Sequence, residues 1–212
     1  MSEEKRLPTA LLWALLLLVI GGIVAAYVGS RLSASARAAK IPVLASLPDF
    51  SLTERGGKTV TRADLLGKVS VVDFIFTSCA AQCPKVTAEM VKIQGFALPR
   101  WKNVQLVSLT VDPERDTPSA LSEYARGYSA DPERWLFLTG ERKRLDDLTR
   151  NGFKVASGSP VPVDTSPEAV LHSVSLVLVD ARGRIRGYYQ STDPQEMAKL
   201  RGDLAALVGS GG

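Results

Sequence analysis

The sequence has few of the cysteine and histidine side chains on which most metal and redox sites depend. Among its 212 residues there are two cysteines and one histidine, namely Cys79, Cys83 and His172. Two cysteines are too few for a disulfide-stapled mini-domain. A single histidine excludes a multi-histidine zinc site. No block of like charge stands out and the net charge is only +4, so charge gives no indication of a nucleic-acid partner.

One long run without charge stands near the N-terminus. Residues 1–9 form a short polar tail, and residues 10–29 then contain no charged side chain. As a helix, such a run is long enough to cross a hydrocarbon core of ~30 Å. It is longer than the apolar core of a signal peptide, so we predict an uncleaved transmembrane anchor. The alternative is cleavage after Ala34-Ser35-Ala36, which resembles an A-x-A site.

The flanking charges say little about the orientation of this run. Two basic residues precede it and three follow it: Lys5 and Arg6, then Arg31, Arg37 and Lys40. This near balance makes the positive-inside rule weak here, but a short tail and a large following domain favour an N-terminus inside. The acidic start is unlike a mitochondrial transit peptide. No cysteine lies near the run, so it is not a lipoprotein signal.

Strands and helices are expected to alternate in the rest of the chain. Residues 30–46 are small and polar and predict a tether, and the globular domain is expected over 47–212. Short apolar runs predict strands, and segments of helical periodicity lie between them. The predicted strands are 69–76, 104–111, 135–138 and 170–179, the last followed by a hairpin turn at 180–183 and a final helix at about 194–208. This order predicts an α/β fold with a parallel or mixed sheet flanked by helices.

The two cysteines lie on a predicted strand-to-helix turn. They follow the apolar run 69–76, and Pro84 directly after Cys83 is typical of the first turn of a helix. Backbone N–H groups and the helix dipole at such a position favour thiolate over thiol. Two thiolates on one short loop can close reversibly into a disulfide or hold one soft metal ion. The simpler interpretation, two buried apolar residues, fits the expected exposed turn less well.

His172 and Asp112 are the other candidates. A lone histidine is usually structural or exposed, but His172 follows an irregular stretch at 158–167 and begins a predicted strand. That position can bring it to the ligand-binding end of the sheet. Two thiolates and one imidazole suit Cu(I) and can also hold Cu(II), whereas zinc usually takes a fourth ligand. Asp112 begins a polar loop that, on physical grounds alone, is typical of a helix cap.

With these residues placed, the chain from about residue 47 onward resembles the SCO/SenC family of thioredoxin-fold copper-binding proteins. Three pieces carry the resemblance: F-I-F-T-S-C-x-x-x-C-P at 74–84, V-D-P-E-R-D-T at 111–117, and His172 ahead of L-V-D-x-x-G at 178–183. The resemblance implies a thioredoxin-like domain that binds copper through Cys79, Cys83 and His172. It implies that Asp112 lies beside the metal or makes a weak axial contact. Ala80 departs from the family, in which proline often follows the first cysteine.

The resemblance also implies a function and a location. We expect a copper metallochaperone anchored in a bacterial inner membrane, with its C-terminal domain in the periplasm or on an equivalent extracytoplasmic side. It would help to assemble the binuclear copper centre of cytochrome c oxidase. Its partner would be the copper-receiving subunit or another cuproprotein.

Two alternatives use the same thiols. In the first, Cys79 and Cys83 are the redox pair of a thiol-disulfide oxidoreductase that keeps the cysteines of the copper-receiving subunit reduced. Their spacing differs from the C-x-x-C of thioredoxin-like redox enzymes. The second, a peroxidase-like enzyme on a similar fold, lacks the expected pattern of an upstream proline and a threonine before the cysteine.

Overall fold

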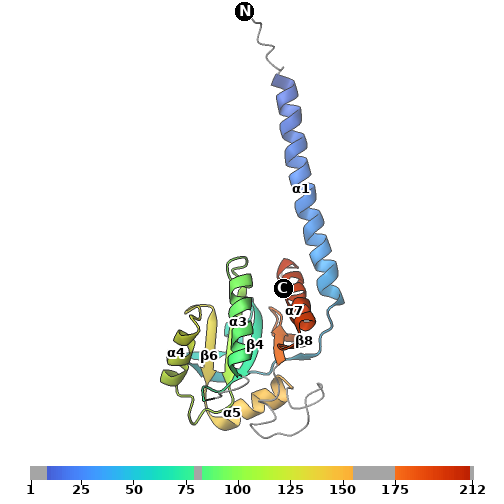
Figure 1. Ribbon diagram of the computed structural model, residues 1–212. Coiled ribbons are helices and arrows are strands. Elements are labelled where there is room, and N and C mark those ends of the chain that lie inside the picture. The colour runs from blue at the N-terminus through green and yellow to red at the C-terminus, as the bar shows by residue number, and fades with distance from the viewer. Residues whose placement is uncertain (1–8, 79–82, 155–174, 211–212) are drawn as a thin grey trace, which may run out of the picture.

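A mixed β-sheet forms the centre of the protein, as the computed structural model in Figure 1 shows. The structure describes residues 9–78, 83–154 and 175–210. In the described residues the sheet has the strand order β1-β8-β7-β4-β5-β6-β2-β3. The strands are β1 (Ala45–Ser46), β2 (Ser51–Glu54), β3 (Thr59–Thr61), β4 (Val69–Ile75), β5 (Val104–Thr110), β6 (Trp135–Thr139), β7 (Ser175–Val179) and β8 (Arg184–Gln190). The helices are α1 (Thr9–Lys40), α2 (Arg62–Leu65), α3 (Cys83–Ala97), α4 (Pro118–Gly127), α5 (Arg142–Asp147), η1 (Leu148–Gly152) and α7 (Pro194–Gly209).

The middle of the sheet is parallel and wholly buried. β4 pairs with β5 and β5 with β6 in parallel, whereas β7 runs antiparallel beside β4. Every residue of β4 and of β5 is buried. Strands buried on both faces need helices on both sides of the sheet, so these apolar runs already determine a layered α/β fold. The predicted strands at 69–76, 104–111 and 135–138 are confirmed to within one residue at each end.

Alternate side chains of β4 enter two separate apolar layers. Val71 and Ile75 pack in the layer that receives residues of α3, α4 and α7. Val72 and Phe74 point to the opposite face, which is covered from α2, α5 and η1. Because the strand period is two residues, Asp73 belongs to the face covered by α3, α4 and α7, and Cys83 of α3 packs in the same layer.

The N-terminal helix is longer than the predicted anchor. α1 continues to Lys40, so residues 30–40 of the predicted tether are helical, in keeping with their alanines and their lack of glycine beyond Ser30. Ala38 and the following Ile41 are buried in the core of the domain. From Trp13 onward α1 is long and apolar enough to cross a membrane, by length and composition. The division into tail, anchor, tether and domain stays a prediction.

Two further elements differ from their predicted extents. The charged segment 141–150, whose leucines at 145 and 148 predict a single helix, is divided between α5 and the π-helical turn η1. The strand predicted at 170–179 is described only as β7, and its first part, with His172 and the irregular stretch 158–167, lies outside the described residues. The predicted hairpin turn is confirmed at Gly183, whose φ of 73° suits glycine.

Candidate metal centre

Cys83 is the first residue of α3 and is buried. Its exposed fraction is 2%, and it packs in the same apolar layer as Val86 and Met90 of that helix. The expectation of an exposed turn is therefore wrong for Cys83, because the apolar face of α3 draws its first residue toward the sheet. The predicted position at the start of a helix is confirmed. There the backbone N–H groups and the helix dipole favour the thiolate form, whereas burial in the apolar layer opposes it.

The other two predicted ligands, Cys79 and His172, lie outside the described residues. In the part of the chain that the structure describes, no group of three or more histidine, cysteine, aspartate and glutamate side chains is placed to hold a metal ion. The three-ligand set of Cys79, Cys83 and His172 therefore stays a prediction. A buried thiol at a helix start does suit a soft ion such as Cu(I), which thiolate ligands select.

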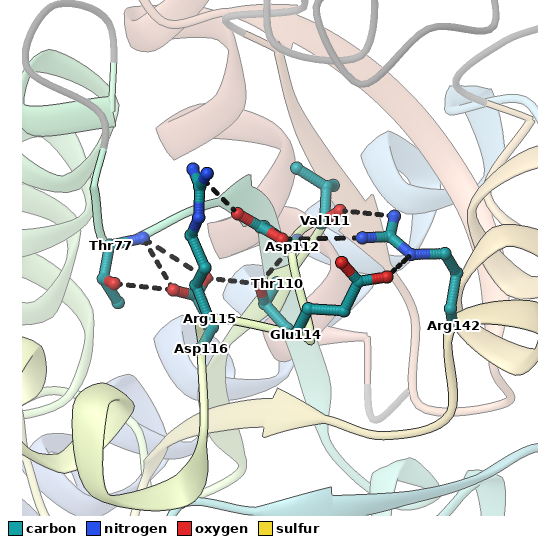
Figure 2. A network of polar contacts seen from close by, with 8 residues as sticks. All are labelled: Thr77, Thr110, Val111, Asp112, Glu114, Arg115, Asp116 and Arg142. Atoms are coloured by element: carbon teal, nitrogen blue, oxygen red, sulfur yellow. Dashed lines mark hydrogen bonds and ion pairs between the residues drawn. The ribbon is translucent and has the colours of Figure 1, made fainter.

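The strand end that leads to the cysteine turn is held by a buried carboxylate. Asp116 is fully buried and accepts hydrogen bonds from the backbone N–H of Thr77, at 3.1 and 3.2 Å, and from its hydroxyl, at 2.6 Å. The hydroxyl of Thr110 donates to the other carboxylate oxygen. Figure 2 shows Asp116 between the two threonines. One side chain thus joins the ends of β4 and β5, two residues before Cys79.

Asp112 lies at the same edge of the sheet, with its carboxylate paired to arginines. Its oxygens lie 3.5 Å from Arg142 and 3.7 Å from Arg115, and its backbone N–H donates to the Thr110 hydroxyl at 2.9 Å. Arg142 also binds Glu114 at 3.0 Å, as Figure 2 shows. Because these cations already neutralise Asp112, its geometry suits a neighbour of the metal better than a primary ligand. Its predicted role beside the metal stays a prediction.

Sequence reasoning missed two residues of this arrangement. Asp116 was part of a loop interpreted only as a helix cap, and Arg142 lies about thirty residues after Asp112. A signal for Asp116 did exist, because Thr77 and Thr110 both end predicted neighbouring parallel strands. Their hydroxyls therefore meet at one edge, where an acceptor is needed. Nothing local in the sequence indicates that Arg142 returns to this loop.

Replacing Asp116 with alanine is expected to lower the free energy of unfolding by about 2–3 kcal/mol, because it leaves three donors without their charged acceptor. Urea unfolding of the full chain measures this. The control is Glu114→Ala, which removes an exposed carboxylate from the same loop and should cost less than about 0.5 kcal/mol. Equal losses in the two variants would mean that Asp116 does not hold the two strand ends together.

A mixed sheet covered by helices, with a thiol at the helix start after the central strand, defines a protein of the thioredoxin-like class. Comparison with known proteins then gives the family. A model of the SCO1/SenC family matches residues 40–207. The chain belongs to the SCO1/SenC family.

Particular relatives agree with this assignment. The SCO1 protein homologue of Bacillus subtilis is 31% identical over 155 residues, which cover 73% of this chain and 78% of the relative. The structure of BsSco, described as a member of the Sco family of cytochrome c oxidase assembly proteins with a disulfide switch, is 29% identical with a TM-score of 0.66, covering 78% of this chain and 96% of BsSco. Bradyrhizobium japonicum ScoI, solved with copper bound, is 25% identical with a TM-score of 0.55, covering 76% of this chain and all of ScoI.

Proposed function

We propose that this protein is a membrane-anchored copper metallochaperone that helps to assemble the binuclear copper centre of cytochrome c oxidase. One observation carries the proposal: in this member of the family a buried cysteine, Cys83, lies at the start of the helix that follows the central strand. The copper in the ScoI structure and the oxidase-assembly description of BsSco support it.

In this proposal copper is the cargo and Cys79, Cys83 and His172 are its ligands. The two thiolates supply the soft donors that Cu(I) prefers, and the imidazole completes the set. Transfer to an acceptor is ligand exchange, in which acceptor thiolates replace those of the chaperone and copper keeps its oxidation state. The thiolates that are set free then take up protons. Asp116 fixes Thr77, two residues before Cys79.

A location is part of the proposal, and α1 supports it. We propose that α1 crosses the membrane once and that the domain faces the periplasm or an equivalent extracytoplasmic side. The acceptor is then the copper-receiving subunit of the oxidase or another cuproprotein. The length and apolar composition of α1 support the anchor.

The alternative is a thiol-disulfide oxidoreductase that reduces the cysteine pair of the acceptor. The burial of Cys83 favours it, because a buried thiol suits a resolving cysteine. Cys79 thiolate attacks the acceptor disulfide and forms a mixed disulfide. Cys83 then attacks the sulfur of Cys79, which releases the second acceptor thiol and leaves a Cys79–Cys83 disulfide. Two electrons pass to the acceptor, and an external thiol reductant must restore the pair.

Copper binding to the reduced full chain in detergent tests the proposal. His172→Ala should weaken Cu(I) binding about tenfold or more and change the absorption spectrum of the Cu(II) form, because one of three ligands is lost. The neighbouring substitution Ser173→Ala is the control and should change neither.

Two outcomes would contradict the metallochaperone. One is that the reduced chain binds Cu(I) no more tightly than the variant in which Cys79 and Cys83 are both serine. The other is that His172→Ala leaves Cu(I) binding unchanged while disulfide exchange with an acceptor peptide depends on both cysteines. The second result would identify the oxidoreductase.

A further inference from the structure

A groove of about 400 Å³ lies between the beginnings of α3 and α7 and carries an excess of positive charge. Three basic side chains line it, from Lys85, Lys92 and Arg201. Glu89 also lines the groove, but its carboxylate is paired with Lys92 at 2.6 Å. In the described part of the chain, Lys85 and Arg201 have no hydrogen bond or ion pair. Two cations are therefore available to a negatively charged ligand.

Two helix N-termini point their positive ends toward this region. Figure 1 shows α3 and α7 beside each other on one face of the sheet, and the first turns of both helices, together with later turns, line the groove. At α7 the chain supplies its own carboxylates, since Asp193 accepts from the backbone N–H of Gln195 and Glu196 follows in the first turn. The first turn of α3 contains no acidic residue. No carboxylate of the chain therefore neutralises the positive end of the α3 dipole, which adds to the charge of Lys85.

An unpartnered hydroxyl lies in the wall of the groove. Ser191 is 6% exposed, and its Oγ has no hydrogen-bond partner among the described residues. A buried polar group without a partner is costly and calls for an explanation. A change of the Ser191 rotamer would be needed to bring this buried oxygen to a ligand in the groove. Pro194 and Met197 contribute an apolar part of the lining, which suits the carbon chain of a side chain better than a free, hydrated ion.

The α7 residues of the groove precede the contact of α7 with α1, and its α3 residues begin just after Cys83. The last residue of α7, Gly209, accepts a hydrogen bond from Arg31 of α1, whereas the groove is lined by residues between Ser191 and Arg201. Arg201, which also lines the groove, lies eight residues before Gly209, about 12 Å along the helix. Lys85, by contrast, follows Cys83 by two residues.

We propose that this groove is a docking site for an acidic segment of a partner protein, whose carboxylates pair with Lys85 and Arg201. A partner bound there contacts Lys85, two residues after Cys83. That the partner is the copper acceptor rests on the proposed function, but the binding of an acidic segment does not.

The test uses the metal-free full chain in detergent and a fluorescein-labelled hexaglutamate peptide, with hexaglutamine as the uncharged probe. Fluorescence anisotropy at low salt measures binding. The groove variant Lys85→Gln/Arg201→Gln should bind hexaglutamate about fivefold more weakly, as expected for the loss of two exposed charge pairs. The matched control, Lys102→Gln/Arg182→Gln, removes the same charge from exposed residues outside the groove and should change affinity less than about twofold.

Three outcomes would overturn the docking site. The first is an equal loss in both double variants, which would mean attraction by net charge alone. The second is equal binding of hexaglutamate and hexaglutamine. The third is displacement of the peptide by inorganic phosphate far beyond that by chloride at the same ionic strength, which would identify a small-anion site. Because no copper is present, none of these results bears on the metal ligands, and a failure of copper binding would leave this test intact.

Discussion

The natural protein is expected to lose about 4 kcal/mol of folding stability as the pH rises from about 4 to about 7, and Asp73→Asn should abolish this loss. Asp73 lies in the middle of β4 and is fully buried. Neither of its carboxylate oxygens has a hydrogen-bond partner among the described residues. A charged carboxylate at this position therefore costs more than the protonated acid.

The sign follows from the two pKa values. Burial raises the pKa of Asp73 from 3.8 to about 7, and the neighbouring hydroxyl of Ser108 opposes the rise only in part. Below pH 4 the side chain is neutral in both the folded and the unfolded chain. Between pH 4 and 7 the unfolded chain loses this proton first, so stability falls with rising pH and becomes level above the folded pKa. Tyr124 faces Asp73 and stays neutral in this range, because burial raises its pKa.

Urea unfolding from pH 4.5 to 8.5 measures this difference. The free energy of unfolding of Asp73→Asn relative to the natural protein should increase steadily up to about pH 7. The control is Asp64→Asn, because the backbone N–H and hydroxyl of Thr61 lower the pKa of Asp64, so its loss should bring no gain with rising pH. Parallel curves for the natural protein and Asp73→Asn would show that Asp73 is not protonated in the folded state near neutral pH.

The buried strands could be predicted because their composition determines their environment. The apolar residues of β4 and β5 form short runs that only a sheet covered on both faces can bury. The start of α3 could also be predicted from the sequence, since Pro84 and the helical spacing of apolar residues after it are local signals. Asp73 shows the limit of this reasoning. It interrupts an apolar run, yet the sequence alone does not reveal that none of the described residues hydrogen-bonds its carboxylate.

The polar contacts at the site depend on the fold more than on local sequence. Asp116 can bind Thr77 only because β4 and β5 are parallel neighbours that end at the same edge. Arg142 reaches Asp112 only because α5 begins beside that edge. Both contacts join segments that are distant in the sequence. Family motifs, by contrast, indicated Cys79, Cys83 and His172 directly, and of these the structure describes Cys83 alone.

The junction between α1 and the domain is another feature that the sequence did not reveal. Arg186 of β8 is almost completely buried, and its guanidinium donates to the carbonyls of Ala38 at 2.7 Å, Ile41 at 2.6 Å and Pro42 at 3.1 Å. It also donates to the carboxylate of Asp180 at 2.8 Å. Four acceptors thus converge on one side chain, and three of them belong to the end of α1 and the residues after it.

Replacing Arg186 with methionine is expected to lower the free energy of unfolding by about 3–5 kcal/mol, because it leaves a buried carboxylate and three carbonyls without this donor. Burial opposes ionisation of Asp180, but hydrogen bonds from Arg184 and Arg186 still hold its pKa below the ordinary value. Urea unfolding at neutral pH measures the loss. The control is Arg184→Met, which removes the other, more exposed partner of the same carboxylate and should cost about 1 kcal/mol or less.

A double substitution separates two contributions to this loss of stability, the unpaired charge of Asp180 and the lost contact with the end of α1. If the unpaired carboxylate causes most of the loss, Asp180→Asn/Arg186→Met should recover part of it. The part that is not recovered belongs to the carbonyls of α1, and it should be accompanied by faster proteolysis between Lys40 and Leu47, because the end of α1 no longer has its donor. An Arg186→Met variant that is as stable as Arg184→Met, with unchanged proteolysis, would show that Arg186 does not fasten α1 to the domain.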